Sequence, residues 1–179
     1  MSRVQLVQVE DANGKAKEVF EDIQRSFGMV PNVFKAYALR PDILEAQWNK
    51  VKAVMQEGDL PPDLKQMIAV VVSKANECQY CVNSHSAALA MMGMSQQQIR
   101  QLIDDLEAAD IPAGTAQVLK LAVKSTKAPR SITNREMEDL KRLGYSDSQV
   151  VEIFSVAALF TAFNKFLDTL QITVDFPAP

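Results

Sequence analysis

The fold class depends on the stretch Pro61-Pro62-Asp63-Leu64-Lys65-Gln66-Met67-Ile68-Ala69-Val70-Val71-Val72-Ser73-Lys74-Ala75. The β-branched run at residues 70–72 would suit a strand. The prolines and the aspartate at the start of the stretch are instead typical of a helix N-terminus. The stretch continues to Ala75 without a turn signal, so we predict a helix. Because this helix would be apolar on most sides, it should lie at the centre of the core.

Helical spacing extends outward from this segment in both directions. Helical patterns recur in several further segments: residues 14–27, 41–55, 96–106, 115–124, 137–143 and 147–170. A further helix is expected over about residues 78–92, because residues 87–92 are good helix formers. A short helix is expected from Asn32 to about Leu39, before Pro41. The pattern predicts one all-α domain over residues 1–179, a helical bundle of about seven to nine helices. The tail at residues 173–179 looks loose.

One short pattern occurs twice. Residues 92–99 and residues 143–150 both read apolar, Gly, apolar, Ser, two polar residues, Gln, β-branched apolar. Each is a glycine that can end a helix followed by a serine that can cap the next one. Short motifs of this kind also arise by chance in helical hairpins. We therefore interpret them as tight helix-helix turns and nothing more.

Composition excludes several classes of protein. The 179 residues are 47% hydrophobic and 23% charged, which indicates a globular chain with a core of its own. The formal net charge of -3 argues against a nucleic-acid binder. The N-terminus has no signal-peptide pattern, and the apolar zone at residues 153–163 is shorter than the roughly 20 residues that span a bilayer. We expect a cytoplasmic protein without a membrane or nucleic-acid partner.

The chemistry is concentrated in Cys78-Gln79-Tyr80-Cys81-Val82-Asn83-Ser84-His85, which holds both cysteines and the single histidine of the chain. On a helix, Cys78, Cys81 and His85 lie at about 0°, 300° and 340°, so they share one face. Cys81 and His85 are an i, i+4 pair. A break at residues 76–77 would put Cys78 near the positive end of the helix dipole, and that position and a nearby histidine both favour thiolate.

Three interpretations of this cluster remain open. Two buried cysteines with an incidental histidine would not explain why all three share one face. A zinc site would take three ligands from this segment, but structural zinc sites usually use two ligand pairs from separate segments, and no second pair exists. A redox-active dithiol with a histidine base accounts for the pattern best. We therefore expect no metal, and no cofactor beyond a redox-active Cys78–Cys81 disulfide.

Residues 76–85, together with the apolar helix before them, resemble the alkylhydroperoxidase D-like branch of the carboxymuconolactone decarboxylase family. The elements Val30-Pro31-Asn32-Val33-Phe34 and Arg40-Pro41 resemble its peroxidase-related members. The likeness covers roughly residues 30–106 and, more weakly, the final helix. It implies an all-helical homo-oligomer, a trimer or hexamer, that reduces hydroperoxides and is recycled by a dithiol donor such as a lipoylated protein.

By the same resemblance, Cys81 would be the attacking thiolate, Cys78 the resolving thiol and His85 the base. The sequence departs from the family at Gln66, where a glutamate of the proton relay is usual. Glutamine can orient His85 by a hydrogen bond but cannot take up a proton; Glu77 and Asp63 are possible substitutes. The leading prediction is a thiol-dependent peroxidase. The alternatives are a redox sensor or weakly active scaffold, and a lactone decarboxylase-type member of the family.

Overall fold

The computed structural model describes residues 2–176, and within that range it contains nine α-helices and no strand. The helices are α1 (Gly14–Phe27), α2 (Asn32–Tyr37), α3 (Pro41–Val51), α4 (Pro62–Ala75), α5 (Gln79–Met91), α6 (Gln96–Asp104), α7 (Ala113–Lys127), α8 (Asn134–Arg142) and α9 (Asp147–Leu170). A π-helical turn, Lys52–Gln56, extends α3, and a 3₁₀ turn, Pro129–Ser131, follows α7. The predicted all-α class is confirmed.

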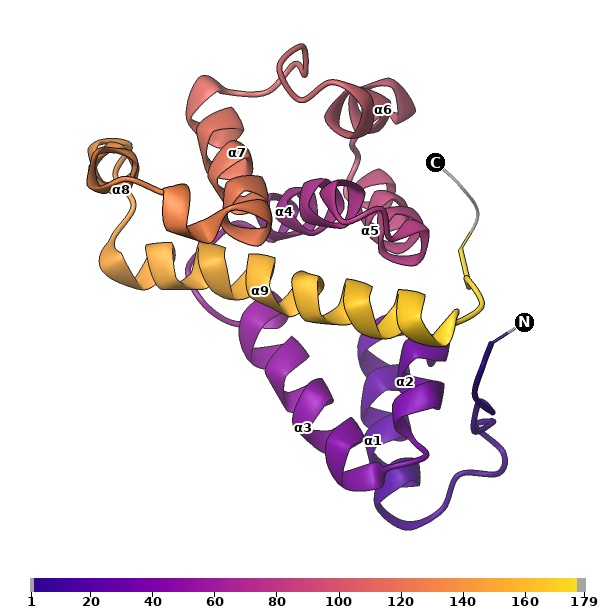
Figure 1. Ribbon diagram of the computed structural model, residues 1–179. Helices are drawn as coiled ribbons and strands as arrows, with labels where there is room; N and C mark the ends of the chain where they lie inside the picture. Colours follow the sequence, from indigo (N-terminus) through magenta and orange to yellow (C-terminus); the bar gives the residue numbers. More distant parts are fainter. Residues whose placement is uncertain (1, 177–179) are drawn as a thin grey trace.

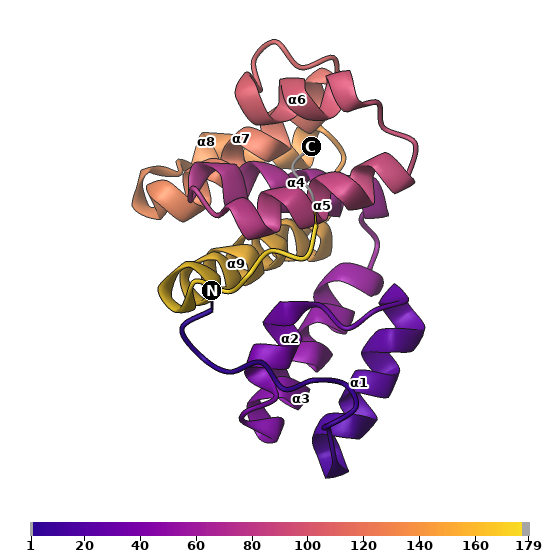
Figure 2. The same cartoon turned by 90° about the vertical axis from the view of Figure 1, so that its right-hand side faces the viewer.

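Helix α9 runs through the middle of the molecule and separates two groups of helices. Helices α1, α2 and α3 pack on one side of it, and α4 to α8 lie on the other, as Figures 1 and 2 show from two directions. The N- and C-terminal segments meet beside the last turn of α9, where the Arg3 amide donates to the Leu170 carbonyl at 2.8 Å.

Helix α4 is the core helix that the sequence predicts. It packs against α5, α7 and α9. From position 67 to position 73 every side chain is buried, including the β-branched run that could have formed a strand. The helix also buries Lys65, whose ammonium pairs with the Glu152 carboxylate on α9. A buried charge needs such a partner because water no longer solvates it.

Helix α9 is long and apolar enough to cross a membrane by length and composition alone, but half of its most apolar window is buried inside the fold. Its buried face contacts α4, α5 and α7. Its apolar side chains Ala157, Phe160 and Phe163 are covered within the chain itself. The helix therefore acts as the central core element of this domain.

The C-terminal tail corrects one prediction, because residues 173–176 are held in place rather than loose. The Asp175 carboxylate accepts hydrogen bonds from the backbone N–H of Asn32 at 2.9 Å and from the Tyr80 hydroxyl. The Asn83 side chain donates to the Phe176 carbonyl at 3.0 Å. These partners lie at least 93 positions away in sequence, so local pattern could not reveal them. The rest of the predicted loose tail, residues 177–179, lies outside the described residues.

Candidate functional site

The site begins at the tight connection between α4 and α5. The Cys78 amide donates to the Ser73 carbonyl at 2.9 Å, and the Glu77 amide donates to the Lys74 carbonyl at 3.0 Å. This pair of bonds is the Schellman arrangement that ends a helix on a left-handed residue. Here that residue is Glu77, with φ of 63°, a conformation that costs a non-glycine residue about 1 kcal/mol. A strained residue therefore directly precedes the first cysteine.

Cys78 and Cys81 occupy the N-cap and N3 positions of α5. These are the two positions whose side chains face each other in a capping box. In the other capped helices they are filled by Ser95 with Gln98, Thr133 with Glu136, and Ser146 with Gln149. The helix start therefore brings the two thiols into contact by ordinary capping geometry. Both cysteines are free thiols, with exposed fractions of 0% and 2%.

The two thiols share a hydrogen bond and therefore ionise unequally. The Cys81 thiol donates to the Cys78 sulfur, and this contact lowers the pKa of Cys78 despite its burial. The pKa of Cys81 is raised well above its usual value by the same neighbour and by burial. Of the two thiols, Cys78 therefore ionises more readily than Cys81. This ranking is opposite to the predicted order, in which Cys81 carries the thiolate, and that order stays a prediction.

His85 lies two turns into α5 and is held by α4 and α9. Its Nδ1 is 2.6 Å from Oε1 of Gln66, and its ring packs edge-on against Phe160 with centroids 4.3 Å apart. Burial lowers the pKa of His85 to about 4, so the ring is neutral at neutral pH. Because an amide oxygen can only accept, Nδ1 must carry the ring proton. The lone pair on Nε2 is then available as a base.

Two further side chains touch the Cys81 sulfur, and the sequence analysis missed both. Ser73 of α4 and Asn164 of α9 are each 0% exposed, and each hydrogen-bonds to Cys81. The Asn164 amide also donates to the Ser73 hydroxyl at 3.0 Å. A serine and an asparagine inside otherwise apolar helices were the available signal. Nothing in a single sequence indicates that positions 91 residues apart meet at one sulfur.

Neither of the two alternative relay carboxylates is buried with this cluster. Asp63 and Glu77 are exposed, and Asp63 is used to cap the first turn of α4 through the Leu64 amide. Of the predicted site residues, the structure therefore brings together Cys78 with Cys81, and His85 with Gln66. Within residues 2–176, no group of three or more His, Cys, Asp or Glu side chains is arranged to hold a metal ion.

Tyr80, between the cysteines, ties α5 to α2 and to the C-terminal tail. Its hydroxyl donates to Asp175 in the tail and accepts from the Val33 amide at 3.2 Å. Burial and then the Asp175 carboxylate raise the pKa of this phenol, so it stays protonated as a donor. Tyr80 thus anchors the cysteine turn against α2 and the tail.

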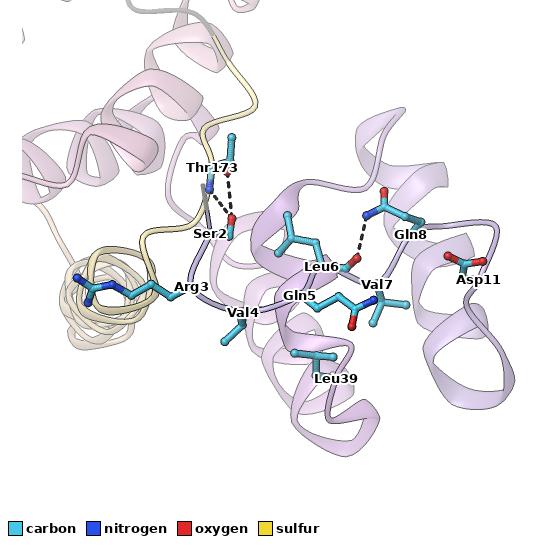
Figure 3. Close-up of a pocket in the computed structure, with 10 residues that line it drawn as sticks. All are labelled: Ser2, Arg3, Val4, Gln5, Leu6, Val7, Gln8, Asp11, Leu39 and Thr173. Carbon is cyan, nitrogen blue, oxygen red and sulfur yellow. Dashed lines mark hydrogen bonds between the residues drawn. The ribbon is translucent and has the colours of Figure 1, made fainter.

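A separate groove lies along the N-terminal segment, with a volume of about 720 Å³. Figure 3 shows its lining, which includes Arg3, Leu6, Asp11, Leu39 and Thr173. Some of its polar groups bond to one another, as in the Ser2–Thr173 hydroxyl pair at 3.0 Å. None of the predicted site residues lines this groove, so we assign it no part in the chemistry.

Several known proteins are similar to this chain in sequence and in fold. Residues 41–128 match the carboxymuconolactone decarboxylase family. A segment of 105 residues is 28% identical to an alkyl hydroperoxide reductase of Mycobacterium tuberculosis. That segment is 59% of this chain but only 28% of the length of the curated relative.

Two crystal structures resemble the whole chain. A peroxidase-related protein with an alkylhydroperoxidase core from Ralstonia eutropha is 28% identical, with a TM-score of 0.89 over 97% of this chain and 92% of that one. A peroxidase-related protein from Silicibacter is 29% identical, with a TM-score of 0.87 over 96% and 91% of the two chains. Residues 41–128 of this chain thus match the carboxymuconolactone decarboxylase family, and the chain as a whole has the same fold as these alkylhydroperoxidase-type structures.

Proposed function

We propose that this protein is a thiol-dependent peroxidase that reduces organic hydroperoxides with the Cys78–Cys81 pair. One observation carries the proposal: two free thiols contact each other at the start of α5, and a neutral histidine lies on the same helix. The names of the M. tuberculosis relative and of the two peroxidase-related structures support the same class of substrate. A lactone decarboxylase would have no use for a paired dithiol.

The first step oxidises one sulfur. The Cys81 sulfur attacks the terminal peroxide oxygen, the O–O bond breaks, and Cys81 becomes a sulfenic acid. The thiol proton of Cys81 passes to Nε2 of His85 and from there to the departing alkoxide, which leaves as an alcohol, while Cys78 keeps its own thiol hydrogen. Gln66 keeps the Nδ1 proton of His85 in place, so that Nε2 stays the basic nitrogen.

The second step resolves the sulfenic acid. The Cys78 thiol attacks the Cys81 sulfur, an S–S bond forms, and water leaves. Over both steps, two thiol hydrogens and two electrons pass to the peroxide and yield one alcohol and one water. An external dithiol then exchanges with the disulfide and restores both thiols. We propose a lipoyl-type dithiol as this donor. We also propose that the protein is a homo-oligomer, since the exposed Met91 at the end of α5 offers apolar surface against which a further copy of the chain would pack.

Steady-state turnover tests the proposal. With excess cumene hydroperoxide and dihydrolipoamide, the protein should consume peroxide continuously, and Cys81→Ser should reduce the rate by about 10³-fold or more. Cys78→Ser is the matched control, because it keeps the attacking sulfur and removes only the resolving one.

A redox sensor is the second candidate, and the burial of both thiols favours it because a donor would reach them slowly. Oxidation by a single equivalent of peroxide, with no further consumption in the presence of dihydrolipoamide, would identify the sensor. An unchanged rate in Cys81→Ser would exclude Cys81 as the nucleophile.

A further inference from the structure

Two buried hydrogen-bond donors meet at one sulfur of the pair and not at the other. Ser73 and Asn164, both 0% exposed, contact the Cys81 sulfur, and each of these contacts favours the thiolate of Cys81. The side chain that contacts the Cys78 sulfur from α9 is Asp168, a carboxylate that disfavours a negative charge there. The polar side chains beside Cys81 therefore favour a negative charge on its sulfur, whereas the one beside Cys78 disfavours it.

The orientation of the Asn164 amide is fixed by its neighbours. Asn76 donates through Nδ2 to Oδ1 of Asn164 at 3.0 Å, which leaves the Asn164 amino group facing the sulfur. One hydrogen of that amino group goes to the Ser73 oxygen at 3.0 Å, and the second is free for Cys81. Because Ser73 accepts from Asn164, its own hydroxyl hydrogen is also free for Cys81.

The chain of hydrogen bonds continues away from the sulfur and locks the whole arrangement. Asn76 also donates to the Thr126 hydroxyl at 3.2 Å, and Thr126 lies 2.6 Å from the Thr161 hydroxyl, which in turn donates to the Ala157 carbonyl at 2.7 Å. A network satisfied at every member is rigid, and rigid donors stabilise charge without reorganising first.

We propose that Ser73 and Asn164 are catalytic residues that stabilise the Cys81 thiolate and so select Cys81 as the attacking sulfur, with Asn76 as the residue that positions them. The choice of Cys81 as the attacking sulfur rests on the proposed peroxidase function, whereas the role of Ser73 and Asn164 as donors to Cys81 does not. Within the pair Cys78 ionises more readily than Cys81, and the two donors stabilise the charge on Cys81 when its proton leaves for the base. Cys81 then reacts, while the Cys78 thiol is ready to resolve.

Thiolate absorbance in the ultraviolet, followed against pH, tests this without any peroxide. In a Cys78→Ser background the only thiol is Cys81, and Ser73→Ala or Asn164→Ala should each raise its titration midpoint by about one pH unit, a tenfold loss of thiolate at fixed pH. In a Cys81→Ser background the only thiol is Cys78, and the same two substitutions should leave its midpoint in place.

The matched control is Thr161→Val, which removes a hydroxyl from the far end of the same network without touching either sulfur. It should leave both midpoints unchanged. Equal shifts in the two backgrounds, or no upward shift in the Cys78→Ser background, would overturn the proposal. Circular dichroism checks that each variant is folded, and if Asn164→Ala is not, Ser73→Ala decides the outcome alone.

Peroxide turnover of the unsubstituted protein, set beside the Cys81 midpoint of the Ser73→Ala variant, separates this proposal from the proposed function. If the Cys81 midpoint moves and the unsubstituted protein does not turn over peroxide, the donor role holds and the peroxidase function fails. If turnover occurs and the midpoint does not move, the peroxidase function holds and the donor role fails.

Discussion

Three connections between helices close with the same two backbone hydrogen bonds, but only one of them carries the cysteines. The connections α5–α6 and α8–α9 end their first helix on Gly93 and Gly144, with φ of 95° and 94°. The connection α4–α5 uses Glu77 at the same place, with φ of 63°. It is also one residue shorter, because Cys78 both closes α4 and caps α5.

The residues that start the next helix differ in the same way. Ser95 and Ser146 form capping boxes with a glutamine three positions later. Cys78 faces Cys81 with no capping hydrogen bond from a side-chain oxygen. One backbone geometry thus yields either a stable cap or a dithiol. The cysteine connection gives up a glycine and a capping serine, each worth about 1 kcal/mol, and gains two thiols in contact.

The largest expected effect comes from giving the cysteine connection the cap of the other two. In Cys78→Ser, a serine oxygen can accept the Cys81 amide hydrogen, and the free energy of unfolding should rise by about 1 kcal/mol. Peroxide turnover should fall by on the order of 10²-fold or more, since no disulfide can form. Denaturant titration of the reduced protein and steady-state peroxide consumption measure the two effects, and a sulfenic-acid reagent detects the unresolved Cys81 intermediate. A variant that still turns over normally would contradict the resolving role of Cys78.

His85 has no polar counterpart in the other two helices, where the seventh residue after the cap is the buried Leu102 or Ile153. His85→Leu should reduce turnover by about 10²-fold through loss of the base. In the unsubstituted protein, the folded state binds this proton only near pH 4, whereas the unfolded chain binds it near pH 6.5. The free energy of unfolding is therefore highest above pH 6.5 and falls between about pH 6.5 and 4, by less than about 3 kcal/mol because solvent reaches part of the ring.

His85→Leu should remove that share of the pH dependence. Denaturant titrations at pH 7 and pH 4.5 on both proteins measure it. The same loss of stability in the variant would mean that another group is responsible.

Gln66, on α4, is the hydrogen-bond partner of His85 and can be changed to test how basic the histidine must be. Gln66→Glu places a carboxylate against Nδ1 of His85, which raises the pKa of the imidazole and makes Nε2 a stronger base. We expect turnover to rise by up to about tenfold near neutral pH. Pre-steady-state loss of free thiol reports the chemical step directly. No gain would mean that the site does not need a relay carboxylate.

The smallest expected effects come from substitutions at Gly144 and Glu77, two residues with positive φ that end their helices. Gly144→Ala should lower the free energy of unfolding by about 1–2 kcal/mol, purely through its φ of 94°, because no atom lies within 4 Å of an added Cβ. Glu77→Gly should raise it by about 0.5–1 kcal/mol for the opposite reason. Thermal or denaturant unfolding measures both. Glu77→Gly also tests the predicted relay role, since a fall in turnover would identify Glu77 as a proton carrier.

Local chemistry made much of this fold predictable. Helix starts and stops such as Ser146 and Gly144 act within a few residues, so a single sequence reveals them. The π-helical turn after α3 and the end of α6 at Asp104 differ from the predicted 41–55 and 96–106 because terminal turns depend on packing as well as propensity.

The site was predictable in part for the same reason. Cys78, Cys81 and His85 are neighbours along one helix, whereas Ser73 and Asn164 meet Cys81 only through the packing of α4 and α9. The hydrogen bond from Tyr80 to Asp175 is likewise a contact between segments that are distant in sequence. Spacing rules describe positions within one element and carry no information about such contacts.

The most direct test is a count of free thiols after one equivalent of an alkyl hydroperoxide, followed by mass spectrometry of the peptide that spans the pair. The account predicts an intramolecular Cys78–Cys81 disulfide, a loss of both thiols per peroxide, and full recovery with dihydrolipoamide. Two thiols that remain free, or a stable sulfenic acid at one cysteine with the other untouched, would contradict it.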